Sequence, residues 1–229
     1  MTRTPGSGAP GGSGLRVDAE RNRQRVVAAA REAFAELGIE VPMDEIARRA
    51  GVGVGTLYRR YPTRGDLVAA AFEAKMTAYA EATAEALAHP DPWRGFCALV
   101  ERICAMQAGD RGFTTVLTMT FPTAKRFEAD RGRAFADFTT LVERAKAAGE
   151  LRADFVPEDL PMFLMANAGV LAATVDAAPA AWRRLVGYLV QACSAPAARQ
   201  LPDPPTPRQM YRAMVRATHP QGDRRTSKR

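Results

Sequence analysis

Residues 53–64 gather side chains that are suited to binding nucleic acid. Hydroxyl and guanidinium groups donate hydrogen bonds to phosphate oxygens, and guanidinium groups also pair with guanine edges. Glycines beside them leave room for a DNA backbone to come close. The candidate DNA-contacting residues are two glycines, two hydroxyl-bearing residues and three arginines: Gly53, Gly55, Thr56, Tyr58, Arg59, Arg60 and Arg64.

Other kinds of chemistry find little support in the sequence. The chain has two histidines, His89 and His219, and it lacks a His-Glu-x-x-His pattern, a phosphate loop followed by lysine, and paired cysteines at metal-ligand spacing. The glycine-rich run at residues 51–55 follows a predicted helix rather than a strand. We therefore predict no catalytic residue, no metal site and no cofactor, and we expect a protein that is not an enzyme.

Two short helices and a tight turn must position the candidate residues. The stretch MDEIARRAGVGVGTLYRRY occupies residues 43–61. The small Ala47 permits a close helix crossing, and Gly51, four residues later, supplies the positive φ angle that a sharp turn needs. This pattern is typical of a helix-turn-helix whose second helix starts near residue 54. The residues expected to face inward are Ile46, Ala47, Ala50, Val54, Leu57 and Tyr61.

A longer helix is predicted on each side of this pair. The first extends from Asp18, a plausible N-cap, to Leu37, and its apolar residues recur at three- and four-residue steps. The second extends from Arg64 to about Ala88. Thr63 and Asp66 can form a capping box at its start, which places Arg64 at a helix N-terminus beside the recognition helix.

These motifs closely resemble the signature of the tetracycline-repressor (TetR) family of bacterial regulators. The resemblance covers residues 18–72, about a quarter of the chain, and rests on DEIARRAGV, GTLY, Tyr61 and Arg64. It implies a three-helix DNA-binding domain followed by a helical domain that dimerises and binds a ligand. By position, it implies DNA contacts for Thr56, Tyr58, Arg60 and Arg64, and Arg59 is a further candidate. The sequence differs from the family pattern at two positions. Gly53 stands where Ser or Thr is frequent in the family, and Pro42 stands where a polar N-cap residue is common.

The rest of the chain is predicted to form further helices at about 92–107, 111–120, 122–148, 160–175 and 179–193. Their large apolar residues are candidates for lining a ligand pocket, although such a stripe is more often plain core. Phe135 and Met165 belong to the same pattern. The predicted pocket residues are Trp93, Phe96, Met106, Phe113, Met119, Phe121, Phe138, Met162, Phe163 and the polar Asn167.

The resemblance also implies partners. The last two body helices are expected to form a homodimer contact, which would hold two recognition helices about one DNA turn apart on double-stranded, palindromic operator DNA. An unidentified small-molecule effector would shift the helix that begins at Arg64 and release the DNA, so the protein is expected to be a repressor. A DNA-binding or architectural protein without an effector, and an activator, are the alternatives.

Composition and charge complete the predicted organisation. The net charge is +7; residues 16–64 carry ten basic and seven acidic side chains, and residues 196–229 carry eight and two. The expected fold is all-α with about nine helices. No apolar stretch has the length of a secretory or membrane-spanning segment, so we expect a cytoplasmic protein without a membrane partner. The predicted parts are a disordered arm (1–15), a helix-turn-helix domain (16–63), a ligand-binding and dimerisation domain (64–195), and a Pro-rich basic tail (196–229), mostly disordered, with room for one short helix near residues 208–216.

The three cysteines, Cys97, Cys104 and Cys193, are too few for a disulfide framework. Cys97 and Cys104 share a helix face but lie two turns apart, which is too far for a bond between them. We expect all three to be small core residues, with a thiol sensor as the alternative.

Overall fold

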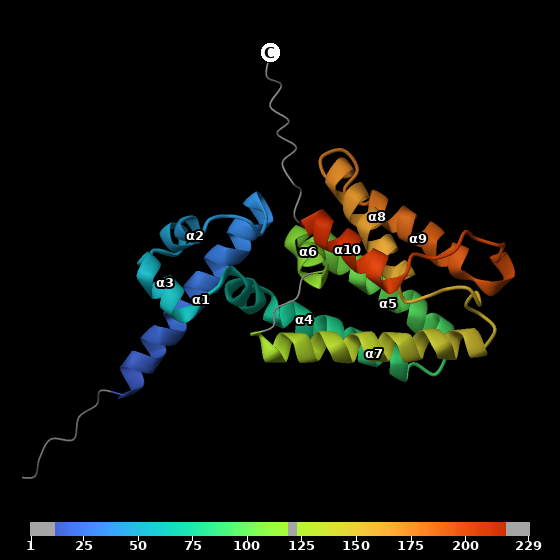
Figure 1. Ribbon diagram of the computed structural model, residues 1–229, viewed down its shortest axis with the longest axis horizontal. Helices are drawn as coiled ribbons and strands as arrows, with labels where there is room; N and C mark the ends of the chain where they lie inside the picture. The colour runs from blue at the N-terminus through green and yellow to red at the C-terminus, as the bar shows by residue number, and fades with distance from the viewer. Residues whose placement is uncertain (1–11, 119–122, 219–229) are drawn as a thin grey trace, which may run out of the picture. The chain divides into compact units, whose positions relative to one another are not determined.

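The chain folds as an all-helical protein, which confirms the predicted fold class (Figure 1). The computed structural model describes residues 12–118 and 123–218, and no β-strand forms among them. The nine predicted helices are present, and α10 corresponds to the short helix allowed for near residues 208–216. The helices are α1 (Gly12–Leu37), α2 (Met43–Ala50), α3 (Val54–Arg60), α4 (Arg64–Ala88), α5 (Pro92–Gly109), α6 (Arg111–Thr118), α7 (Lys125–Ala147), α8 (Asp159–Thr174), α9 (Ala181–Cys193) and α10 (Pro207–Thr218).

The first helix is longer than predicted. It begins at Gly12 rather than at Asp18, and the expected N-cap Asp18 lies inside it. Residues 15–17, Leu-Arg-Val, contain no helix breaker, so the helix continues through them. The predicted disordered arm at 1–15 is therefore wrong for residues 12–15, and its other residues lie outside the described part of the chain.

The chain divides into two compact units, residues 1–71 and 72–229, and the division falls inside α4. The predicted boundary at residue 64 is therefore too early. The first two turns of α4 belong to the N-terminal unit because Leu67, Val68 and Ala71 are buried there. The Arg31 Nε also donates a 2.5 Å hydrogen bond to the Ala71 carbonyl, which ties α1 to this part of α4.

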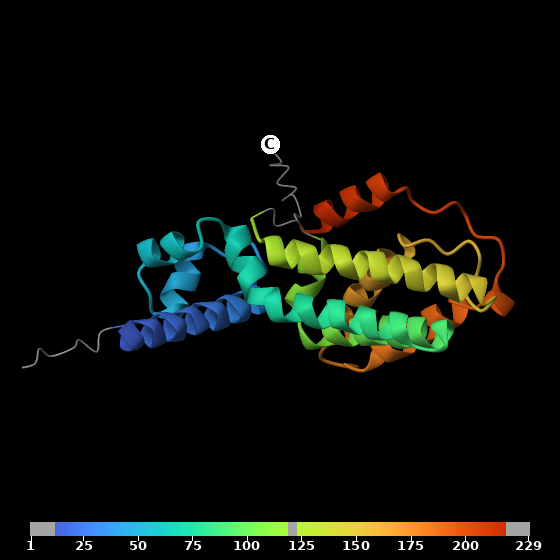
Figure 2. The same cartoon turned by 90° about the horizontal axis from the view of Figure 1, so that it is seen from below.

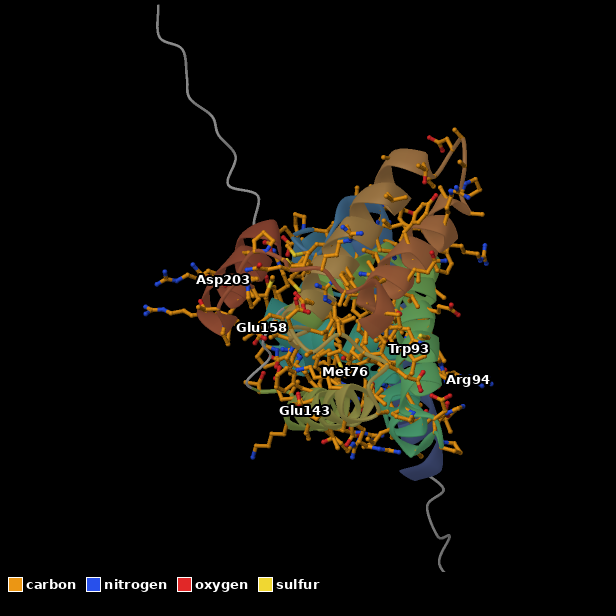
Figure 3. All side chains as sticks on the ribbon, turned by 90° about the vertical axis from the view of Figure 1, so that its right-hand side faces the viewer. Met76, Trp93, Arg94, Glu143, Glu158 and Asp203 are labelled. Carbon is orange, nitrogen blue, oxygen red and sulfur yellow. The ribbon has the colours of Figure 1, made fainter. Side chains whose placement is uncertain are left out.

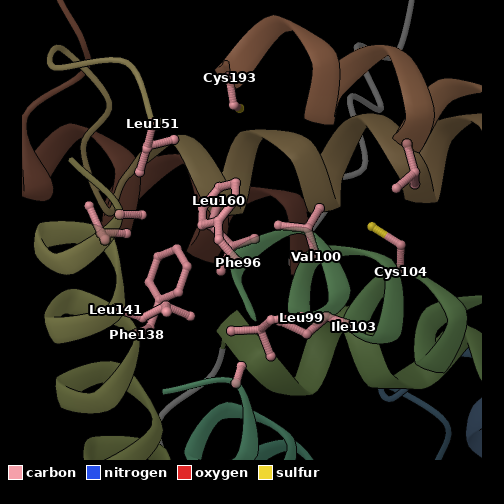
Figure 4. Packing of buried hydrophobic residues seen from close by; sticks show 14 of the residues in the cluster. Phe96, Leu99, Val100, Ile103, Cys104, Phe138, Leu141, Leu151, Leu160 and Cys193 are labelled. Atoms are coloured by element: carbon pink, nitrogen blue, oxygen red, sulfur yellow. The ribbon is translucent and has the colours of Figure 1, made fainter. Parts of the chain in front are cut away.

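The core of the C-terminal unit is built around α5. Phe96, Leu99, Val100 and Ile103 recur at three- and four-residue steps and are at most 2% exposed. Figure 4 shows these side chains packed with Phe138 and Leu141 of α7 and Leu160 of α8. The Phe96 ring centroid lies 5.7 Å from that of Trp93, 6.3 Å from that of Phe138 and 5.2 Å from that of Phe155. This aromatic cluster fixes how α5 and α7 pack.

Polar contacts fix the remaining helices of this unit. Helix α7 runs beside the C-terminal part of α4 in the same direction (Figures 1 and 2), and Thr77 Oγ1 donates a 3.0 Å hydrogen bond to the buried Asp130 carboxylate. The buried Arg152 joins the end of α9 to the segment after it. Its guanidinium donates to the carbonyls of Ala192 (3.1 Å) and Arg199 (2.6 Å) and pairs with Asp154.

The segment after residue 195 is more ordered than predicted. Thr206 and Gln209 form a capping box, with Thr206 N donating to Gln209 Oε1 at 2.8 Å and Gln209 N donating to Thr206 Oγ1 at 3.3 Å. Helix α10 then packs against α6, and Met210 is 6% exposed. Helix α10, Pro207–Thr218, thus corresponds to the short helix allowed for near residues 208–216, and it is held because an apolar side of it packs against the body. Residues 219–229, with His219, lie outside the described part.

The cysteines occupy the positions expected of core residues. Cys104 and Cys193 are buried, and Cys97 is half-buried. Burial raises the pKa of Cys97 to about 11 and the pKa of Cys104 and of Cys193 to about 12. All three thiols are therefore protonated at neutral pH, which is unfavourable for reaction with oxidants because the thiolate is the reactive form.

Candidate nucleic-acid interface and ligand cavity

The turn between α2 and α3 has the geometry that the sequence predicts. Gly51 adopts φ 64° and ψ 38°, and Val52 N donates to the Ala47 carbonyl at 3.0 Å. Ile46, Ala47 and Ala50 are buried as expected. Pro42 stands at the N-cap of α2 without a side-chain cap, but its carbonyl accepts from Glu45 N and Ile46 N, so the helix start is satisfied by backbone alone.

Helix α3 is held by Leu57 and Tyr61, which are 1% and 6% exposed. The helix repeat places Gly55 and Arg59, two positions on either side of Leu57, on the opposite side, and both are exposed. Tyr58 is 45% exposed beside them. The expected burial of Val54 is wrong: it is 39% exposed, because it lies in the first turn of a helix of only seven residues. The outward face of α3 therefore carries mainly Gly55, Tyr58 and Arg59, with Thr56 at its edge.

The two glycines at this face have no structural reason inside the protein. Gly53 has ordinary extended backbone angles, φ −66° and ψ 139°. A Cβ at Gly55 would meet no described atom within 4 Å beyond its own helix neighbours, and one at Gly53 would meet only Thr56 Oγ1 at 3.8 Å. Because glycine inside a helix costs stability relative to alanine, Gly55 is explained better by something that approaches from outside.

The arginines of the N-terminal unit fall into two groups. Arg48 and Arg49 both hydrogen-bond Glu45, and these contacts lower the pKa of that carboxyl to about 2. Arg64 pairs with Glu40, so this predicted DNA contact already has an acidic partner on the protein.

A second group forms no ion pair with any residue that the structure describes. It comprises Arg59 and Arg60 of α3 and Arg21 and Arg25 of α1. Arg25 donates a 3.0 Å hydrogen bond to Asn22, and, besides the hydrogen bond from Arg23, the charge of Arg60 helps to lower the pKa of Glu20. These four guanidinium groups are available to an external anion.

The start of α4 forms the predicted capping box. Thr63 N donates to Asp66 Oδ2 at 3.0 Å, and Asp66 N donates to Thr63 Oγ1 at 3.1 Å. This cap orders the peptide directly after α3 and keeps Arg64 in the first turn of α4.

The C-terminal unit contains a largely apolar cavity of about 480 Å³. This volume lies in the range of pockets that hold drug-sized molecules. Its walls come from α4, α6, α7, α8 and α10 and from the residues just before α8, among them the half-buried Glu158 (Figure 3). The residues that matter for its chemistry are Tyr79, Arg131, Gly132, Phe135, Phe138, Met210 and Tyr211.

Polar groups in the cavity wall are few. The Arg131 guanidinium donates to the Val116 carbonyl at 3.0 Å and lies 5.5 Å from the Phe127 ring centroid, and burial lowers its pKa from its ordinary value. Burial raises the pKa of Tyr79 to about 12, so its phenol stays neutral at neutral pH. The carboxylates of Glu128 and Glu158 also line the cavity, and Arg131 Nη1 lies 3.6 Å from Glu128 Oε2. The wall thus offers aromatic faces with one guanidinium, one phenol and two carboxylates nearby.

Most of the predicted pocket residues lie elsewhere. Of the eight that lie in the described part of the chain, only Phe138 lines this cavity. Phe96 and Phe113 are fully buried in the packed core, Trp93 stacks on Phe96, and Phe163 packs against Phe155. They fill core space because several helices press on them at once. The other predicted residues off the cavity wall are Met106, Met162 and Asn167; Met119 and Phe121 lie outside the described part.

Asn167 makes a buried polar link between α5 and α8 instead. Its Nδ2 donates to Gln107 Oε1 at 2.8 Å and to the Cys104 carbonyl at 3.3 Å, and Gln107 Nε2 donates to the Leu164 carbonyl at 3.2 Å. Both amides are at most 1% exposed. Because apolar substitutes would leave buried carbonyls unsatisfied, this pair fixes the register of the two helices.

The cavity residues that the sequence did not single out are Tyr79, Arg131, Met210 and Tyr211. The apolar positions Met210 and Tyr211 within the predicted short helix near residues 208–216 were the available signal for α10. No sequence signal pointed to Tyr79 and Arg131, since their proximity depends on how α4 packs against α7.

Comparisons with known proteins agree with these geometries. The model of the bacterial regulatory proteins of the tetR family matches residues 26–71. An HTH-type transcriptional regulator of Staphylococcus aureus is 44% identical over 54 residues, which are 23% of this chain and 29% of that protein. The matched segment thus spans under a third of the length of the curated relatives.

Solved structures match over a longer stretch. A TetR transcription regulatory protein from Mycobacterium vanbaalenii is 30% identical over 79% of this chain and 99% of its own, with a TM-score of 0.46. The transcriptional regulator FadR from Bacillus subtilis, in complex with stearoyl-CoA, is 16% identical over 73% of this chain and 97% of its own, with a TM-score of 0.55, and shares the fold.

Two further features of the described residues bear on other classes of function. None of the helices in residues 12–118 and 123–218 combines the length and apolar character needed to cross a membrane. The same residues hold no group of three or more histidine, cysteine, aspartate or glutamate side chains placed to bind a metal ion.

Proposed function

The chain belongs to the TetR family of bacterial regulatory proteins, and from this premise we propose that it is a transcriptional repressor that binds operator DNA and is released by a small apolar effector. Helix α3 would enter the major groove and read base edges with its outward face. The proposed contacts are Gly53, Gly55, Thr56, Tyr58, Arg59, Arg60 and Arg64.

One observation carries the DNA-binding part of this proposal. The face of α3 opposite Leu57 holds a glycine with open space around it next to Arg59, which has no acidic partner in the described structure. A surface meant only for solvent gains nothing from glycine at a helical position, whereas a surface that packs on DNA does. Arg64 would exchange Glu40 for a phosphate, or share the two.

A homodimer would place two such faces on the two halves of a palindrome. Helices α8 and α9 support this proposal because they expose Met162 (38%) and Tyr188 (55%), and Val175, directly after α8, is 41% exposed. The Arg184 guanidinium lies over the Tyr188 ring, 5.0 Å from its centroid, so the two side chains together cover part of this surface.

Salt-dependent binding of duplex DNA tests this part of the proposal. The purified protein is expected to bind a labelled duplex from the region upstream of its own gene, and the affinity should fall about 10³-fold or more between roughly 50 and 200 mM salt if six or more phosphates are contacted. Fluorescence anisotropy measures this. Arg59→Ala is expected to weaken binding by about tenfold or more, because a bidentate base contact contributes about 1–3 kcal/mol. If the wild-type protein did not bind duplex DNA at low salt, the proposal would be ruled out.

The cavity is the proposed effector site. Its aromatic walls favour an apolar molecule, and Arg131 and Tyr79 offer hydrogen-bond donors to a polar end. Helix α4 contains both Tyr79 in the cavity wall and Arg64 in its first turn. A ligand that displaces Tyr79 would therefore move the helix that carries a proposed DNA contact, which is the route by which binding would release the operator.

Filling the cavity tests the effector site. A Cβ at Gly132 would meet no described atom within 4 Å, and Gly132 lines the cavity, so Gly132→Leu should fill it without a clash. We expect the wild type to bind the apolar fluorophore N-phenyl-1-naphthylamine and the leucine variant to bind it at least about tenfold more weakly, a change of 1.4 kcal/mol. The variant should unfold no earlier than the wild type. Equal probe binding by both proteins would exclude the cavity.

A further inference from the structure

The N-terminal half of α1 carries arginines whose purpose the family match does not explain. That match begins at residue 26, yet α1 begins at Gly12 and is helical throughout. Arg21 and Arg25 lie one helical turn apart on this additional stretch, and both are exposed. Arg21 and Arg25 form no ion pair with any residue between 12–118 and 123–218, whereas Arg23 between them is held by Glu20 at 2.8 Å.

These arginines face the turn that precedes α3. A groove of about 490 Å³ lies between the two elements. One wall is a single face of α1, formed at three- and four-residue steps by Asp18, Arg21, Asn22 and Arg25. The other wall comprises Gly51, Val52, Gly53 and Thr56. The groove therefore joins α1 to the same glycines and threonine that are proposed to contact DNA.

A second cavity, of about 380 Å³, lies on the neighbouring face of α1. Asn22 and Thr56 line both cavities, and Arg23, Arg59 and Arg60 line the second one. Tyr61, in the wall of this second cavity, is only 6% exposed, and its buried hydroxyl has no hydrogen-bond partner among the described residues. Because a buried hydroxyl without a partner is costly, this cavity is suited to a group that brings an acceptor, such as a phosphate oxygen or a water bound to one.

The charge of this surface favours an anion. The two cavities are lined by five arginines and by one acidic residue, Asp18. Four of the five arginines form no ion pair in the described structure, in contrast to Arg48, Arg49 and Arg64, each of which pairs with at least one carboxylate. Arginines that lack internal partners and are gathered along one edge match the regular negative charge of a nucleic-acid backbone.

We propose that the α1 segment 18–25 is a second DNA-contacting element, in which Arg21 and Arg25 hold backbone phosphates of the duplex beside the groove that α3 enters. This inference rests on the proposed function. It adds contacts that are independent of base sequence, so it predicts tighter binding to any duplex and a steeper dependence on salt. Discrimination between DNA sequences, through contacts with base edges, is still assigned to α3.

The test uses the full chain and a labelled random-sequence duplex of about 30 base pairs, titrated between roughly 50 and 200 mM salt. The Arg21→Gln/Arg25→Gln variant removes two exposed charges. The slope of log K against log[salt] is expected to become shallower by about 1.8 for each bound protomer, since each lost phosphate contact removes about 0.9. Affinity near 0.1 M salt should fall by about tenfold or more.

Two matched variants make the result specific. Arg94→Gln/Arg102→Gln removes the same charge from exposed residues of α5, and it should keep the wild-type slope. Arg21→Lys/Arg25→Lys keeps the charge and should keep most of the slope, because a phosphate contact needs a cation. Circular dichroism should give wild-type thermal unfolding for all variants, since the altered side chains are exposed.

The possible results separate the two proposals. A wild-type slope in the Arg21→Gln/Arg25→Gln variant would overturn the α1 contact while leaving the proposed function intact. An equally shallow slope in the lysine variant or in the α5 variant would also overturn it. The change in slope would then come from altered structure or from net charge. Wild-type protein without salt-dependent binding to any duplex would overturn the proposed function, and the α1 contact with it.

Discussion

Gly55→Ala is expected to unfold at a higher temperature than the wild type and to bind duplex DNA more weakly. Alanine inside a helix is more stable than glycine by about 0.5–1 kcal/mol, and the added methyl meets no described atom within 4 Å. On the DNA side, the same methyl would occupy space at a close contact, where overpacking costs about 1–3 kcal/mol. Affinity should therefore drop by about tenfold or more. Thermal unfolding and fluorescence anisotropy measure the two effects on one sample.

Gly132→Ala is the matched control for this variant. Gly132 is also an exposed helical glycine with open space at the Cβ position, but it lies on α7 in the C-terminal unit. It should gain similar stability and keep wild-type DNA affinity in the absence of effector. If Gly55→Ala gained stability without losing affinity, Gly55 would not face DNA, and the proposed orientation of α3 would be wrong.

Phe96→Ala is expected to lower the free energy of unfolding by about 3–5 kcal/mol, the usual cost of deleting a large aromatic side chain from a core. The ring is 0% exposed and contacts the rings of Trp93, Phe138 and Phe155. Because α5 is central to the C-terminal unit, the cavity left behind cannot collapse without moving α7. Urea unfolding followed by circular dichroism measures the loss.

Phe135→Ala provides the comparison. Phe135 is 58% exposed and lines the apolar cavity, so its removal should cost less than about 1 kcal/mol while reducing N-phenyl-1-naphthylamine binding. The two variants thus distinguish a residue of the packed core from a residue of the cavity wall. A small loss of stability for Phe96→Ala would show that the aromatic cluster is not the centre of the core.

The helix-turn-helix was predictable because its determinants are local. Gly51 marks the turn by its own backbone freedom, and the spacing from Ile46 to Tyr61 depends only on helix periodicity. The error at Val54 has a physical cause: periodicity assumes a full helix surface, whereas α3 has only seven residues and its first turn projects into solvent. The length of α1 was missed because a plausible N-cap, Asp18, is tolerated inside a helix.

The cavity was not predictable because it depends on residues that are distant in sequence. Phe96 and Phe138 have the same residue type and similar helical surroundings, yet only Phe138 lies on the cavity wall. The difference arises from which helix covers each ring, and the position of one of those helices, α10, depends on its contact with α6, which is distant in sequence. A single sequence identifies an apolar helix face but not the space left between faces.

The place of α10 in the cavity wall has a consequence for how this protein can change over evolutionary time. Pro207, Met210 and Tyr211 contribute to the wall from a helix that follows an exposed connecting segment, and none of them belongs to the core cluster around Phe96. Tyr211 is 51% exposed and lines the cavity, so substitutions there would change the shape of the wall outside the main core. If the cavity is the proposed effector site, new ligand preferences would arise by drift in one small module while the α3 surface and the main core are inherited intact.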